Sequence, residues 1–201
     1  MLVDGGIARP IAYVAGDELS WYDFNSNTGA LTRISGIAGF RPNPNFLATL
    51  GTSLYAVTSG NRVGAYTIDL ETYGLTFVND VATGGNGPAH VAVDGAGKFI
   101  FVANYGNGAI AVFPAQTGGR IGDSIQTINA GANAHQIVVD PSNRYVFVPC
   151  LGVNYVAQYL FDSNTGILTA NAVPTVATAN GAGPRHLAFT SDGKHAYLIN
   201  E

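Results

Sequence analysis

The chain has 201 residues, of which 47% are hydrophobic and 11% charged, and its formal net charge is −4. This balance is typical of a globular domain with its own core, and it excludes an intrinsically disordered chain, which would be more charged and less apolar. The nine Lys and Arg residues form no basic stripe, so no nucleic acid partner is expected, and no apolar run approaches the roughly 18 residues of a membrane span.

Five apolar segments with a central aromatic residue recur along the chain, and each is expected to form a β-strand. They cover residues 11–15, 53–57, 99–103, 145–149 and 195–199. Their central aromatics lie 42, 46, 46 and 50 residues apart. A turn rich in Gly, Asp, Pro or Asn precedes the last four, and these residues supply the backbone angles that tight turns require.

Further strand patterns recur in phase with the aromatic segments. An alternating strand precedes the turn at residues 91–93, 137–139 and 187–189. A third strand follows at 19–24, 63–68, 109–113 and 156–161, and a glycine turn leads to a less regular fourth strand at 76–82, 124–129 and 168–178. Apolar spacing of three and four never persists long enough to predict a helix.

Four short strands in a unit of about 46 residues predict an all-β fold, a β-propeller of four-stranded blades. Such blades bury their faces on one another, and their innermost strands line a central channel. A β-sandwich is the alternative, but it lacks a strict internal repeat. The predicted blades of the single domain 1–201 are 1–40, 41–86, 87–132, 133–182 and an incomplete 183–201.

The two ends of the repeat do not match. The first unit lacks its innermost strand, and the fifth stops after its second strand. Four periods could close into a four-bladed ring, but the last unit then carries one strand too many. We therefore expect an open array of blades that is part of a longer chain.

A site needs particular chemistry, so it is expected where the repeats disagree. Aligned on the aromatics, the start of the innermost strand carries Asn43, Ala89, His135 and Arg185 in successive blades. The end of the second strand carries Asp17, Ser59, Tyr105, Leu151 and Glu201. Equivalent positions lie near one rim of a propeller channel, and an antiparallel hairpin returns Glu201 toward Arg185. His135, Arg185 and Glu201 are therefore expected to converge.

These three side chains suit a lactone or a carboxylate ligand. Arginine offers a planar fork for an anion or a developing oxyanion, and histidine exchanges a proton near neutral pH. Glutamate can orient the histidine, pair with the arginine or act as a base. The structural alternatives are a hydrogen-bonded scaffold histidine and a simple Arg–Glu ion pair.

Other candidates are weaker. His90 and His186 share one equivalent position and are expected to be scaffold contacts, while His195 lies beside a turn and should face solvent. Cys150 is the single cysteine and has no cationic sequence neighbour, so neither a disulfide nor a reactive thiol is expected. The sequence lacks a Gly-x-Ser-x-Gly elbow, which disfavours a serine esterase. It also lacks a phosphate-binding glycine loop and clustered metal ligands, so no metal site is expected.

Two segments resemble the lactonase-family seven-bladed β-propellers: GPRHLAF at 183–189, followed by YLINE at 197–201. FVANYG at 101–106 and the pair Ala134–His135 resemble it too. That family includes the propeller type of 6-phosphogluconolactonase and the fungal-type 3-carboxy-cis,cis-muconate lactonising enzyme.

The resemblance implies seven blades, of which about four are present here. It also implies a metal-free site, without organic cofactor, at the channel mouth, with His, Arg and Glu at the positions of His135, Arg185 and Glu201. Two departures stand out. Asn133 replaces a second histidine that the family usually has two places before His135, and an arginine expected from a later blade is missing.

The leading hypothesis is therefore a hydrolase that opens a sugar lactone such as 6-phosphogluconolactone, with a small anionic lactone or carboxylate as its substrate. A muconate cycloisomerase would use the same residues, and a non-enzymatic binding propeller is the third possibility. A cytoplasmic location is expected, because residues 1–10 contain Asp4 and no basic region before an apolar stretch. The alternative is a periplasmic or secreted protein from which a signal peptide has been removed.

Overall fold

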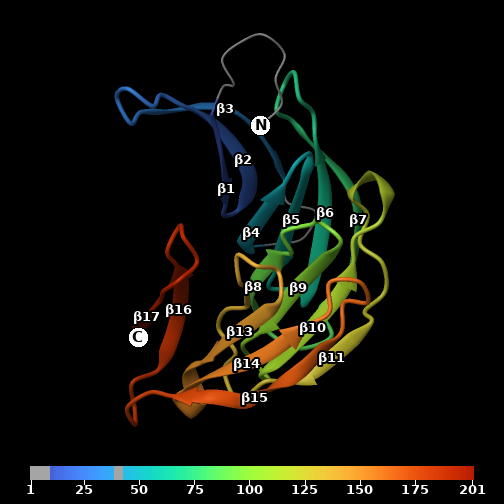
Figure 1. The fold of residues 1–201 in the computed structure, drawn as a ribbon. Coiled ribbons are helices and arrows are strands. Elements are labelled where there is room, and N and C mark those ends of the chain that lie inside the picture. Colours follow the sequence, from blue (N-terminus) through green and yellow to red (C-terminus); the bar gives the residue numbers. More distant parts are fainter. Residues whose placement is uncertain (1–9, 39–42) are drawn as a thin grey trace.

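The structure is a computed structural model that describes residues 10–38 and 43–201 (Figure 1). Within these residues, seventeen β-strands form five antiparallel sheets. The first sheet contains β1 (Ile11–Ala15), β2 (Glu18–Phe24) and β3 (Leu31–Ala38). The second contains β4 (Pro44–Leu50), β5 (Ser53–Thr58), β6 (Arg62–Ile68) and β7 (Leu75–Ala82).

The remaining sheets follow in chain order. The third contains β8 (Pro88–Val93), β9 (Phe99–Asn104), β10 (Ala109–Pro114) and β11 (Gln126–Asn129). The fourth contains β12 (Val138–Val139), β13 (Tyr145–Cys150), β14 (Tyr155–Phe161) and β15 (Leu168–Ala177). The fifth contains β16 (Pro184–Phe189) and β17 (Ala196–Asn200).

The prediction of an all-β propeller with four-stranded blades is confirmed, since three consecutive sheets are complete four-stranded meanders. Besides strands, the described residues contain only two single turns of 3₁₀ helix, Thr117–Gly119 and Leu151–Val153. No helix among them has the length and apolar character needed to traverse a bilayer. Residues 1–9 and 39–42, which belong to the first two predicted blades, lie outside the described residues.

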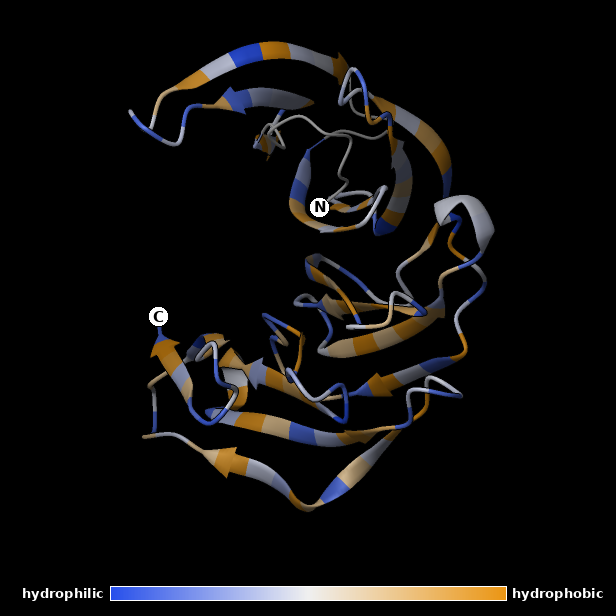
Figure 2. Ribbon diagram, turned by 45° about the horizontal axis from the view of Figure 1, so that its top comes forward, coloured by the Kyte–Doolittle hydropathy of each residue, from blue (hydrophilic) through white to orange (hydrophobic). Residues whose placement is uncertain are grey.

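The five sheets follow one another along an arc (Figures 1 and 2). We call β4, β8, β12 and β16 the inner strands. β4, β8 and β16 lie on the inside of this arc (Figure 1), and β12 is the equivalent edge strand of the fourth sheet. Apolar positions concentrate on the strands, while the connecting loops are more hydrophilic (Figure 2). Each buried apolar cluster contains residues of two consecutive sheets, so the cores lie between neighbouring blades.

Large aromatic side chains fill these cores. Phe101 of β9 is fully buried, and its ring meets that of Phe161 in β14 edge-on, at 5.2 Å between centroids. Tyr55 of β5 and Phe113 of β10 belong to the core between the second and third sheets. Burying each aromatic ring contributes about 2–3 kcal/mol, so Tyr55 and Phe101, two of the recurring aromatics of the sequence repeat, help to join neighbouring blades.

Amide side chains connect the blades at their outer edge. Gln126 of β11 binds both backbone groups of Leu168 in β15: its Nε2 donates to the carbonyl at 3.0 Å, and the Leu168 N–H donates to its Oε1 at 2.8 Å. Asn79 of β7 makes the same paired contact with Ile121, at 2.9 and 3.0 Å. These contacts fix neighbouring sheets in register far from the inner strands.

The strand register corrects one predicted equivalence. Pro44, Pro88 and Pro184 each pair with the last residue of the following strand, and Ala134 bridges Cys150 in the same way. The residue in line with Ala89, His135 and Arg185 is therefore Asn45, and the prediction of Asn43 was wrong. The hairpin of the second sheet is two residues shorter than that of the third: Phe46 lies 11 positions before its partner Val57, whereas His90 lies 13 before Ala103.

Candidate functional site

The backbone forms the same irregular feature at the start of each inner strand. The residue before the strand has a left-handed conformation, with φ of 57° at Asn43, 59° at Gly87, 57° at Asn133 and 62° at Gly183. Only glycine adopts this conformation without strain, and asparagine is the side-chain residue that tolerates it best. This requirement gives a physical reason for asparagine at position 133.

A β-bulge follows directly. The pairing shifts by one residue between Pro184 and His186, and equivalent shifts occur in the second, third and fourth sheets. Arg185 is the extra residue of its bulge, and His135 occupies the same place in its own blade. Because a bulge redirects the extra residue relative to the regular alternation of a strand, these positions can aim functional side chains away from the core.

His135 and Arg185 meet across the boundary between two blades. The Arg185 Nε–H donates to His135 Nε2 at 3.1 Å. This bond requires an imidazole with an unprotonated Nε2, so His135 is neutral and carries its proton on Nδ1. The Nδ1 atom is buried and has no partner among the described residues.

Glu201 joins the site through a contact with Arg185, its neighbour on the same blade. Its backbone N–H donates to the Gly183 carbonyl at 2.9 Å, which holds it opposite the bulge. Its Oε2 lies 3.4 Å from Arg185 Nε. The side chains of Arg185 and Glu201 are 44% and 54% exposed, so both charges remain accessible to a ligand.

The histidines of the site favour their neutral forms. Burial lowers the pKa of His135, and the positive charge of Arg185 and the proximity of His186 lower it further. The pKa of His186 is lowered by burial and by Arg185, with Glu201 acting in the opposite direction. At neutral pH the group therefore combines two neutral imidazoles with one cation and one carboxylate.

Sequence reasoning assigned His90 and His186 to the scaffold, yet both lie near His135. The rings of His135 and His186 meet edge-on at 5.1 Å between centroids. His90 is only 7% exposed, and its ring lies 4.0 Å from that of Phe46. Burial, with smaller contributions from His186 and His135, lowers the pKa of His90 to about 3. Their common position on β8 and β16, the inner strands on either side of β12, was the signal in the sequence.

Tyr105, which follows β9, also contacts His135. Its ring meets the imidazole edge-on at 5.5 Å between centroids, and its side chain is exposed. The Asn133 side chain donates to the Tyr105 backbone carbonyl at 3.2 Å. Asn133 therefore fixes the strand end that carries this ring instead of supplying a second imidazole.

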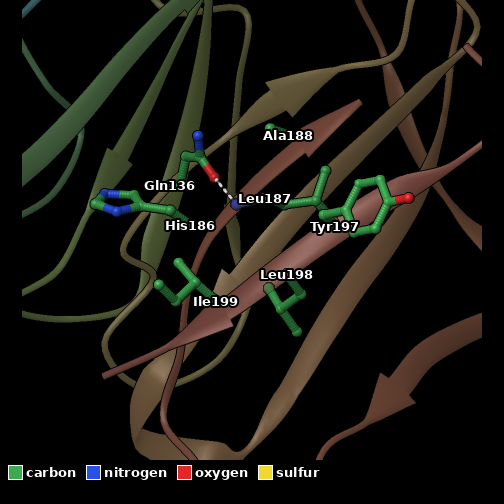
Figure 3. Close-up of a pocket in the computed structure, with 7 residues that line it drawn as sticks. All are labelled: Gln136, His186, Leu187, Ala188, Tyr197, Leu198 and Ile199. Carbon is green, nitrogen blue, oxygen red and sulfur yellow. Dashed lines mark hydrogen bonds between the residues drawn. The ribbon is translucent and has the colours of Figure 1, made fainter. Parts of the chain in front are cut away.

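A pocket of about 370 Å³ adjoins the site on the fifth sheet (Figure 3). Its lining is mostly apolar and consists of Gln136, His186, Leu187, Ala188, Tyr197, Leu198 and Ile199. Tyr197 and Ile199 are 70% and 65% exposed, whereas the equivalent Phe101 and Ala103 are fully buried beneath the next sheet. This face of β17 thus has the composition of a blade interface.

Two other predictions concern metal ions and the thiol. In the part of the chain that the structure describes, no group of three or more His, Cys, Asp or Glu side chains is placed to hold a metal ion. Cys150 is fully buried and its Sγ contacts the Ala130 carbonyl at 3.4 Å. Burial raises the pKa of this thiol to about 12, so it is protonated and unreactive.

The sequence also matches known proteins. The family described as "Lactonase, 7-bladed beta-propeller" matches residues 11–201. A 6-phosphogluconolactonase of Erwinia tasmaniensis is 34% identical over 178 residues, which cover 88% of this chain and 53% of that protein. A 6-phosphogluconolactonase of Bacillus subtilis is 32% identical over 79% of this chain and 49% of its own length. The chain thus spans about half the length of these curated relatives.

Solved structures agree with the fold. A crystal structure of a Bacteroides fragilis protein superposes with a TM-score of 0.85 at 26% identity, covering 99% of this chain and 63% of that one. The periplasmic gluconolactonase of Pseudomonas aeruginosa has a TM-score of 0.82 at 24% identity, covering 96% and 62% of the two chains. The second likeness is one of fold alone.

Proposed function

Because the chain belongs to the seven-bladed lactonase β-propeller family, we propose that it hydrolyses a sugar lactone that bears an anionic group, at the cluster of His135, Arg185 and Glu201. The names of the relatives make 6-phosphogluconolactone the first substrate to test. The chain spans about half of those relatives, and the proposal concerns the inner rim that it contains.

The observation that carries this proposal is the state of Arg185. Its Nε–H is engaged by His135 Nε2, which fixes the plane of the guanidinium. Its terminal nitrogens have no hydrogen bond to a described residue, and the side chain is partly exposed. A fixed guanidinium with free N–H donors suits an oxyanion that develops during ester hydrolysis, and the carboxylate of the product.

His135 holds Arg185 in place, and Glu201 and Arg185 carry the chemical steps. Water adds to the lactone carbonyl carbon, and Glu201 accepts its proton, because the His135 Nε2 lone pair already accepts from Arg185. The terminal N–H groups of Arg185 stabilise the negative charge on the carbonyl oxygen. The bond from the carbonyl carbon to the ring oxygen then breaks, and the proton held by Glu201 passes to that oxygen to give a hydroxy acid.

The test compares two arginine variants on 6-phosphogluconolactone, with the spontaneous reaction subtracted. Arg185→Ala is expected to lower kcat/KM at least roughly a hundredfold, the scale of one lost oxyanion donor. Arg144→Ala is the control, since Arg144 lies in the exposed turn at the far end of the β12–β13 hairpin. Equal rates for wild type and Arg185→Ala would remove Arg185 from the mechanism.

The same preparation distinguishes the other functions. Closure of 3-carboxy-cis,cis-muconate without lactone hydrolysis would identify a cycloisomerase and overturn the hydrolase assignment. Turnover of neither compound, with retained binding of a peptide or glycan, would identify a binding propeller and overturn it as well.

A further inference from the structure

We propose that Gln136 is a positioning residue. Its hydrogen bond to the Leu187 backbone holds the bulge so that Arg185 lies against His135. This inference rests on the proposed function for its catalytic consequence, but its structural content can be measured separately.

The contact joins the two blades that share the site. Gln136 follows His135 directly in the sequence, and Leu187 lies two residues after Arg185. The Leu187 N–H donates to Gln136 Oε1 at 2.6 Å (Figure 3). Because β17 pairs with the other edge of β16, this N–H belongs to the inner edge of the fifth sheet, where the described residues supply no neighbouring strand.

A second hydrogen bond lies on the other side of the bulge. The Gly183 N–H donates to Asn154 Oδ1 at 3.1 Å. The fourth blade therefore holds the fifth at residues 183 and 187, and Arg185 lies midway between these two points. The Arg185–His135 contact closes the same interface, so the position of the guanidinium depends on both bonds.

Comparison of the repeats separates the two contacts. Asn61 accepts from the Gly87 N–H at 2.8 Å in the same way as Asn154 accepts from Gly183, so this bond is part of the recurring scaffold. The residues equivalent to Gln136 are Phe46, His90 and His186. Phe46 has no polar side-chain atom, the Nδ1 atom of His90 has no partner among the described residues, and no inner strand follows His186 within residues 43–201. The Gln136 contact therefore occurs at the one blade interface that carries the His–Arg pair.

The experiment measures the Arg185–His135 contact by NMR and catalysis by kinetics, in wild type and in Gln136→Leu. Leucine keeps the bulk of the side chain and removes the acceptor. In wild type we expect an Arg185 Nε–H resonance that is protected from exchange with water. In Gln136→Leu we expect loss of this protection, a higher pKa for His135 because the guanidinium has moved away, and a fall of about ten- to a hundredfold in lactone kcat/KM, mainly in kcat.

Gln126→Leu is the matched control, since it removes two hydrogen bonds between blades at the outer edge. It should reduce resistance to urea while leaving the Arg185 resonance and the pKa of His135 unchanged. Gln136→Glu retains an acceptor and should restore the protected Arg185 Nε–H. If Gln136→Leu does not fold, Gln136→Asn, whose shorter amide cannot reach Leu187, takes its place with the same expected shifts.

Protection of the Arg185 Nε–H that persists in Gln136→Leu or Gln136→Asn would overturn the inference. The same loss of protection in Gln126→Leu would overturn it too, because the effect would then be one of general loosening. Both NMR readings hold whether or not the protein hydrolyses lactones, so a failure of the proposed function is recognised separately, by absent turnover in wild type.

Discussion

Acidification should destabilise this protein through one buried imidazole, that of His90. Its pKa is about 3 in the folded state, compared with an ordinary value of 6.5. Between these values the unfolded chain binds a proton that the folded chain does not, so stability falls as the pH is lowered. Each pH unit well below 6.5 corresponds to about 1.4 kcal/mol, and the slope is smaller near 6.5, where the unfolded imidazole is half protonated. Moving from pH 7.5 to pH 5 should therefore lower the free energy of unfolding by about 2 kcal/mol.

The structure supplies a matched variant for this measurement. The equivalent position of the preceding blade is Phe46, so His90→Phe keeps an aromatic ring and removes the titrating group. Urea unfolding at pH 7.5 and pH 5 should give a smaller loss of stability for His90→Phe than for wild type, by about 2 kcal/mol. His135, His186 and the carboxylates titrate in both proteins and cancel in the comparison. The same pH dependence in both proteins would refute the assignment of a neutral, buried His90.

Two further predictions concern the site and the core. Glu201→Gln keeps the shape of the side chain and removes the base, so kcat on 6-phosphogluconolactone should fall by a factor of roughly 10²–10⁴ with little change in KM. An unchanged kcat would exclude Glu201 as the base. Cys150 is buried with a pKa of about 12, so a thiol reagent at pH 8 should modify it only after urea is added, and rapid modification of the folded protein would contradict this burial.

The propeller could be predicted from the sequence because its physical cause is periodic. Each blade needs an aromatic or large apolar residue at the same place in its second strand to fill the space against the next sheet. Tyr55 and Phe101 occupy this place in the second and third sheets, and both are buried in the cores between sheets. The convergence of His135 and Arg185 followed from the same periodicity, since equivalent positions of consecutive blades are adjacent in space.

Other features depend on details that a repeat does not encode. The turn after β4 is short, so the prediction placed Asn43, instead of Asn45, in line with Ala89, His135 and Arg185. The burial of His90 arises from packing against Phe46, a contact between blades that the sequence leaves open. The role of Gln136 could not be foreseen either, because its partner is a backbone N–H on the inner edge of another strand.

Binding of the reaction product tests most directly whether Arg185 forms an anion site beside His135. The measurement is a titration of the ¹⁵N-labelled protein with 6-phosphogluconate, followed through the imidazole signals of His135 and His186. We predict saturable shifts of both imidazoles in wild type and in Arg144→Ala, and their loss in Arg185→Ala. Shifts that persist without the Arg185 guanidinium, or that appear only at residues away from the inner strands, would contradict the account.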